Sequence, residues 1–180
     1  MTENKKMQTT QNETLSKINL KFLELKKINN LALMPFIMAG DPNIETTSRI
    51  LLKLQEKGAD LIELGIPYSD PLADGPIIQF SASKALKSGT TAIKVIQLLE
   101  SIKEKLHIPV ILFTYFNPLL KYGLENFCEL ASKAGVAGLI ILENLEASSK
   151  GRSGIINPAT PALDANSQKF SIPKFKIGLK

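Results

Sequence analysis

Cysteine, histidine and tryptophan are scarce in this 180-residue sequence, which has one Cys, one His and no Trp. A single cysteine, Cys128, excludes an internal disulfide framework and a cysteine-based metal cluster. With His107 as the only imidazole, neither a histidine metal triad nor a Ser-His-Asp triad is expected. The sequence therefore predicts no metal site and directs attention to carboxylates as the chemistry-bearing groups.

Long hydrophobic runs and targeting signals are also missing. No apolar stretch reaches the roughly 20 residues that a membrane-spanning helix needs. Residues 1–14 lack the apolar core of a secretory signal, and the first 30 residues hold three Glu and no Arg, unlike a transit peptide. With its free cysteine, the chain is expected in a reducing compartment, either the cytoplasm of a prokaryote or the stroma of a plastid.

Positive charge is in excess only near the carboxyl end. Residues 1–146 contain 16 Lys and Arg against 16 Asp and Glu, whereas residues 147–180 contain six against one. We therefore divide the chain into a neutral body, 1–146, and an atypical basic tail, 147–180. The tail is either a weak anion-binding arm or a solvated, poorly ordered end. A neutral body with 6% aromatic residues argues against a nucleic-acid-binding module.

Hydrophobic periodicity predicts alternating strands and helices in the body. Asp41 and Thr90 are expected to cap the helices that follow them, with Pro42 in the first helical position. Alternation of this kind indicates an α/β fold with a parallel sheet. No G-x-G-x-x-G or G-x-x-x-x-G-K motif is present, which favours a (β/α)₈ barrel over a dinucleotide-binding fold. The expected strands are 33–39, 60–64, 109–115 and 138–142, and the expected helices include 14–28, 79–88 and 124–134.

The carboxyl ends of the strands are where a parallel barrel places its active site, and Glu63 lies at one of them. A carboxylate within an apolar strand end usually has a partner or a raised pKa, and a raised pKa suits a general acid or base. Two interpretations are open. Glu63 is either such an acid/base group or a carboxylate that accepts backbone N–H bonds.

Other candidates follow the same rim of the predicted sheet. Asp70 and Asp74, in the loop after Glu63, are typical turn residues when taken singly, but with Glu63 they offer carboxylates for divided acid and base roles. Tyr115 is expected in packing. Phe36 and Phe113 are core residues by default, or one of them is the floor for a flat aromatic ligand.

Three segments of the body have a distinctive sequence: Pro35-Phe-Ile-Met-Ala-Gly-Asp-Pro42, Ile62-Glu-Leu-Gly-Ile-Pro-Tyr-Ser-Asp-Pro-Leu-Ala-Asp-Gly-Pro76 and Thr114-Tyr-Phe-Asn-Pro118. Together they resemble the tryptophan synthase alpha chain family. The middle segment is highly specific, and the similarity runs from about residue 15 to residue 142. The resemblance implies a (β/α)₈ barrel of which only the first four βα units are recognisable.

The resemblance also implies an activity. The family is a lyase that cleaves indole-3-glycerol phosphate to indole and glyceraldehyde 3-phosphate in tryptophan biosynthesis. By motif match, Glu63 takes the place of the catalytic glutamate and Asp74 that of the catalytic aspartate. The positions that line the indole pocket are matched by Phe36, Phe113, Tyr115 and Ile140.

A partner and a cofactor assignment follow from the same resemblance. Indole passes to a beta subunit in an alpha2beta2 tetramer, and pyridoxal phosphate belongs to that beta subunit, so the alpha chain itself uses no cofactor. The Asp70–Pro76 loop and the Asn117-Pro118 region resemble surfaces that face the beta subunit.

The match ends after the fourth strand. The family continues with a Pro-Asp-Leu-Pro-like segment where this chain has Leu142-Glu-Asn-Leu-Glu146. A barrel of this type takes about 250 residues and forms its phosphate site after strands seven and eight. The abrupt change of pattern near residue 146 favours a truncated or frameshifted gene. Half a barrel leaves strand edges open and would pair with a second copy or aggregate.

Three hypotheses follow. The first is the lyase itself, and the second is an inactive truncated fragment that only binds a beta subunit. The third, another phosphate-handling barrel enzyme, is disfavoured by the loop between Gly65 and Pro76.

Overall fold

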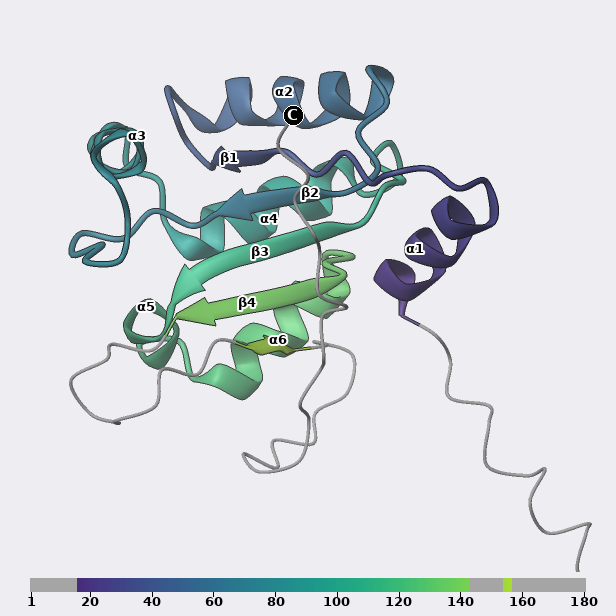
Figure 1. The fold of residues 1–180 in the computed structure, drawn as a ribbon. Helices are drawn as coiled ribbons and strands as arrows, with labels where there is room; N and C mark the ends of the chain where they lie inside the picture. Colours follow the sequence, from purple (N-terminus) through teal and green to yellow (C-terminus); the bar gives the residue numbers. More distant parts are fainter. Residues whose placement is uncertain (1–15, 143–153, 157–180) are drawn as a thin grey trace, which may run out of the picture.

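Four parallel strands with helices between them form the body of the molecule (Figure 1). We describe a computed structural model over residues 16–142 and 154–156. None of the helices in these residues is long and apolar enough to cross a membrane. The elements, in chain order, are α1 (Lys17–Lys27), β1 (Phe36–Met38), α2 (Ile44–Glu56), β2 (Ile62–Gly65), α3 (Pro76–Lys87), α4 (Ala92–Ile102), β3 (Val110–Tyr115), α5 (Phe116–Leu120), α6 (Leu124–Lys133), β4 (Gly138–Leu142) and β5 (Gly154–Ile156).

The sheet has the order β1-β2-β3-β4-β5, so sequential parallel strands are also neighbours in space. Helices α2, α4 and α6 cover one face of it (Figure 1). The main core lies between these helices and the strands. Its largest fully buried side chains include Leu51, Leu64, Leu112, Phe127 and Leu139. Of these, Leu64, Leu112 and Leu139 lie on strands, where they alternate with the residues of the other face of the sheet.

The other face, which would be the inside of a barrel, is covered near the start of the strands by α1. Ile18 of α1 packs in a small buried cluster with Leu61, Ile111 and Ala137. Figure 1 shows α1 where the strands begin and α3 and α5 where they end. The carboxyl ends of the strands, where the sequence predicts the site, therefore have α3 and α5 as their neighbours.

Two predicted helix caps are wrong. Asn43, not Asp41, caps α2, because its side chain accepts a hydrogen bond from the backbone N–H of Thr46 at 2.8 Å. The cap of α4 is Thr91 rather than Thr90, which is buried. Asp41 is thereby left to make other contacts.

Other boundaries shift by a few residues. The third helix begins at Pro76, three residues before the predicted start, since proline suits the first helical position. Asn117 and Pro118 lie in a short helix, α5, directly after β3. The first strand is confined to Phe36–Met38.

The last strand, β5, lies in the range 147–180 and pairs with β4 in the antiparallel sense. The remainder of that range lies outside the described residues. One segment of the predicted tail therefore forms the edge of the sheet beside β4.

Candidate functional site

The register of the strands places most predicted site residues on one face of the sheet. Glu63 on β2 lies between Phe36 of β1 and Ile111 of β3, and the next inward position pairs Gly65 with Phe113. Phe113 is in turn the neighbour of Ile140 on β4. Because side chains alternate along a strand, these residues share the inner face.

An aromatic pair forms the floor of this face. The rings of Phe36 and Phe113 meet edge to face, with centroids 5.8 Å apart and planes at 87°. Gly65 makes this possible, because a Cβ atom there would lie 2.7 Å from the Cζ atom of Phe36. Both rings are only partly buried. They therefore present a hydrophobic surface suited to a flat ligand.

Glu63 is a half-buried carboxylate beside that floor. Its backbone N–H donates to the carbonyl of Pro35 at 3.0 Å, but among the described residues its carboxylate forms no hydrogen bond and no ion pair. Burial raises its pKa above the usual range of a glutamate. No backbone N–H donates to this carboxylate within the described residues, so the carboxylate is available to exchange a proton, and its role as an acid or base stays a prediction.

Asp74 lies in the loop after β2 and is held by Tyr115. Its backbone N–H donates to the carbonyl of Pro71 at 3.0 Å, which is the turn geometry expected of a loop aspartate. Burial raises the pKa of its carboxyl, and a hydrogen bond from the Tyr115 hydroxyl partly offsets that rise. Asp74 and Glu63 form no hydrogen bond with each other within the described part of the chain.

Tyr115, at the end of β3, connects the strand to the loop. Its hydroxyl accepts a hydrogen bond from the backbone N–H of Ala73 at 3.1 Å, and its ring packs on Tyr68 with centroids 5.1 Å apart. The amide of Asn117 donates to the Tyr68 hydroxyl at 3.2 Å. Packing was the expected role of Tyr115, and the structure adds a polar role. Tyr68 is not among the predicted site residues, although it lies within the most specific sequence segment.

Asp70 is exposed, and its backbone carbonyl accepts from the N–H of Leu72 at 3.0 Å. It is thus an exposed turn residue. The structure brings Asp74, Tyr115 and Tyr68 together. Asp70 makes no side-chain hydrogen bond to them within the described residues, although its charge is close enough to contribute to the raised pKa of Tyr115, after burial and Asp74.

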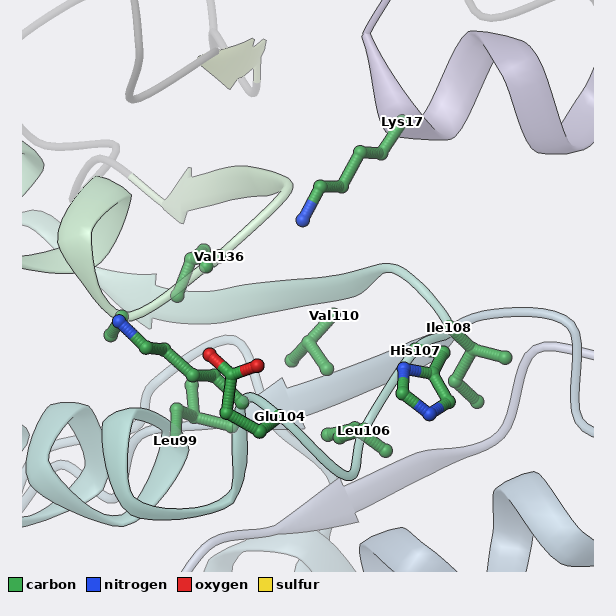
Figure 2. A pocket seen from close by; sticks show the side chains of 11 residues that line it. Lys17, Leu99, Glu104, Leu106, His107, Ile108, Val110 and Val136 are labelled. Atoms are coloured by element: carbon green, nitrogen blue, oxygen red, sulfur yellow. The ribbon is translucent and has the colours of Figure 1, made fainter.

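The two best-defined hollows in the described residues lie elsewhere. One, of about 270 Å³, is lined at the amino ends of the strands by apolar side chains such as Leu99 and Val136, with Lys17, Glu104 and His107 at its rim (Figure 2). The other is a shallow groove between α2 and α4. The candidate site is therefore an open face of the sheet and its adjoining loop. His107, the single imidazole, is exposed at the first hollow and lies away from the candidate site.

Comparisons with known proteins agree with the sequence motifs. The sequence model of the family "Tryptophan synthase alpha chain" matches residues 22–151. A relative described by the same words, from Prochlorococcus marinus subsp. pastoris, is 83% identical over 141 residues, which are 78% of this chain and 50% of that protein. A second, from Prochlorococcus marinus strain SARG, is 62% identical over 120 residues, covering 67% of this chain and 45% of that protein.

Solved structures show the same likeness in three dimensions. The tryptophan synthase subunit alpha from Legionella pneumophila str. Paris has a TM-score of 0.68 and 38% identity, covering 71% of this chain and 49% of that one. A tryptophan synthase structure from M. tuberculosis in an open form has a TM-score of 0.69 and 30% identity. These neighbours confirm the expected fold class, α/β of the (β/α)₈ barrel family. The chain spans about half the length of the relatives that it matches.

Proposed function

The chain belongs to the tryptophan synthase alpha chain family, and from that premise we propose that it supplies the acid and base groups of a lyase. The proposed reaction cleaves indole-3-glycerol phosphate to indole and glyceraldehyde 3-phosphate. The proposal rests mainly on Glu63. Its half-buried carboxylate has a raised pKa, has no partner among the described residues and lies beside the pair of Phe36 and Phe113 rings. A carboxyl of that kind is able both to deliver and to accept a proton.

In the proposed reaction, the carboxyl groups of Glu63 and Asp74 have different roles. Breaking the bond at indole C3 requires a proton at C3, which Glu63 supplies. Polarising the indole N–H stabilises the charge that moves through the ring, and this is the role proposed for Asp74. The ionised Glu63 then removes the proton of the glycerol hydroxyl as the aldehyde forms. No step needs a cofactor of this chain, and we propose that pyridoxal phosphate belongs to the beta subunit.

Binding of the indole ring is proposed for the inner face. Phe36 and Phe113 offer an edge and a face to a flat ring, and such pairs prefer offset or edge-to-face contact. Ile140 lies beside Phe113 on β4 and extends the apolar surface. The family's phosphate site is expected after strands seven and eight, beyond the four parallel strands described here.

A beta subunit is the proposed partner, in an alpha2beta2 assembly. Three large apolar side chains near Asp74 support a protein partner, because Leu72, Ile77 and Phe80 are 70%, 81% and 68% exposed. Clusters of exposed apolar residues mark interaction surfaces. The alternative function, a fragment that binds a beta subunit without catalysis, rests on the same surface.

We propose a cytoplasmic location, or a plastid stroma. Bacterial relatives support the first of these.

The test is indole release from indole-3-glycerol phosphate by the purified chain, with and without added beta subunit. We expect Glu63→Gln and Asp74→Asn to abolish release. The matched control is Glu56→Gln, since Glu56 is an exposed glutamate on α2. Release that is equal in Glu63→Gln and in the unchanged chain would reject the assignment of Glu63.

A second measurement separates the alternative function. Binding of the chain to the beta subunit is measured by sedimentation, with Phe80→Asp as the surface variant and Leu23→Asp on α1 as its control. Leu23 is also exposed, at 44%. Binding without indole release establishes the non-catalytic function. If Phe80→Asp loses neither binding to the beta subunit nor indole release, the interface lies elsewhere.

A further inference from the structure

We propose that Asp41 is a positioning residue: by holding α3 against the end of β1, it fixes the loop that carries Asp74. The assignment of chemistry to Asp74 rests on the proposed function. The placement of the loop is a property of this chain, and it can be measured without any activity.

Asp41 makes two side-chain contacts to α3. One carboxylate oxygen, Oδ1, lies 2.6 Å from the Nζ atom of Lys84, and the other, Oδ2, accepts a hydrogen bond from the Ser81 hydroxyl. These contacts hold the pKa of the Asp41 carboxyl below its usual range, with Lys84 as the main cause. The Asp41 side chain is only 22% exposed, so the ion pair is partly shielded from water. An anchored pair of this kind restrains a helix more than an exposed pair does.

The residue before Asp41 holds the other end of the same helix. The carbonyl of Gly40 accepts a hydrogen bond from the hydroxyl of Ser88, the residue that ends α3, at 3.1 Å. The N–H of Gly40 donates to the buried Thr47 hydroxyl at 2.8 Å, which ties this turn to α2. Gly40 has a φ of +86°, and a Cβ atom there would overlap the side chain of Thr90. The turn after β1 is thus a rigid base that contacts α3 at two places.

The amino end of α3 transmits this restraint to the loop. Gln79, in the first turns of α3, donates from its Nε2 atom to the carbonyl of Asp74 at 2.8 Å. The helix itself begins at Pro76, directly after Gly75. Apolar packing of Ala82 and Ala85 on Met38 keeps the helix against β1. A shift of α3 away from Asp41 would therefore move the backbone of Asp74 away from the Tyr115 hydroxyl.

The experiment measures the placement of Asp74 in the full 180-residue chain. Two variants remove the contacts, Asp41→Ala and Lys84→Ala, and Lys84→Arg retains the positive charge. The readouts are amide hydrogen exchange of residues 66–79 and the titration of the Asp74 carboxyl by carbon NMR. We expect exchange in the loop to rise by about tenfold in both alanine variants. We also expect the pKa of Asp74 to fall towards its ordinary value as the carboxyl becomes solvated, and Lys84→Arg to restore both readouts.

A control separates positioning from a general loss of stability. Leu130→Ala on α6 removes a partly buried side chain of the main core and leaves every contact of α3 in place. We expect Leu130→Ala to lower the overall stability of the chain without changing the titration of the Asp74 carboxyl. The proposal is overturned if Asp41→Ala and Lys84→Ala leave the loop exchange and the titration unchanged, or if Leu130→Ala changes them equally. Absence of indole release from the unchanged chain would reject the proposed function and leave this result intact.

Discussion

The Tyr115 hydroxyl lowers the pKa of the Asp74 carboxyl while it accepts a hydrogen bond from the neighbouring backbone N–H of Ala73 at 3.1 Å. One side chain at the end of β3 thus acts on both the backbone and the carboxyl of a loop that follows a different strand, β2. Nearby Asp74 in turn raises the pKa of the Tyr115 hydroxyl, although burial is the larger cause. The hydroxyl is therefore un-ionised, and a donor, at neutral pH.

Tyr115→Phe tests this relationship. Removal of the donor takes away the interaction that lowers the pKa of Asp74, so the pKa of this carboxyl rises further. A raised pKa in the folded state means that stability is lost as pH increases through it. We expect the variant to be about 1 kcal/mol less stable at pH 7. The difference should shrink below the ordinary pKa of aspartate, where the carboxyl is protonated in both folded and unfolded states.

Urea unfolding at several pH values, with carbon NMR of the Asp74 carboxyl, checks both expectations. Tyr122→Phe is the control, because it removes a tyrosine hydroxyl from outside the loop contacts. An Asp74 titration in Tyr115→Phe that matches that of the unchanged chain would contradict the hydrogen bond.

Glu63→Gln should stabilise the folded chain at neutral pH. Burial raises the pKa of Glu63, and within the described part of the chain no partner offsets the cost of ionising it, so the ionised carboxylate destabilises the fold. Below the ordinary pKa of glutamate, the group is protonated in both states and contributes no such penalty. As pH rises through the folded-state pKa, the unchanged chain loses stability, and the variant does not. We expect a gain of up to about 1 kcal/mol at pH 7 and none near pH 4.

The measurement is urea unfolding of the two chains between pH 4 and 8, with Glu56→Gln as the control. Glu56 is an exposed partner of Lys53, so its replacement should give no stabilisation at any pH. A Glu63→Gln chain that is less stable than the unchanged chain at pH 7 would mean that the carboxylate has a favourable partner.

The sequence was sufficient for the strand order and for the inner face. Glu63, Phe113, Tyr115 and Ile140 lie on strands whose apolar runs predict them directly, and parallel neighbours in sequence order bring their carboxyl ends together. Side-chain contacts between segments that are distant in the sequence could not be predicted in the same way. Asp41 was predicted to cap a helix because Pro42 follows it, yet Asn43 takes that role. A rule based on the local sequence at a helix start takes no account of where α3 lies, and α3 provides the partners of the Asp41 side chain.

The same limit applies to the tail and to Gly65. The antiparallel pairing of β5 with β4 is a contact between segments whose sequences carry no register signal for one another. The sequence predicts that Gly65 begins a loop. In the structure it is the last residue of β2 and lies against the ring of Phe36. Only the neighbouring strand explains why glycine is required there.

Gly65→Ala is expected to disturb the aromatic floor. The added Cβ atom would lie 2.7 Å from the Cζ atom of Phe36 and 3.2 Å from the Cε atom of Met38, so the ring must move and its contact with Phe113 changes. Crowding of this kind in a packed region costs about 1–3 kcal/mol. Urea unfolding measures the cost, and ring-proton shifts of Phe36 and Phe113 report the displacement. Gly75→Ala is the control, because a Cβ atom there meets nothing within 4 Å. Equal effects of the two substitutions would reject the steric explanation.

Cys128 should behave as a buried apolar side chain and not as a reactive thiol. It lies on the core side of α6 beside the fully buried Phe127, and it is 8% exposed. Burial raises the pKa of its thiol, which leaves little of the reactive thiolate at neutral pH. We expect a thiol reagent to label the folded chain at least about tenfold more slowly than the chain in urea. Cys128→Ser should cost about 1–3 kcal/mol, since it buries a hydroxyl that must find a partner, and Cys128→Ala should cost less. Labelling of the folded chain at the unfolded rate would show that α6 opens readily from the sheet.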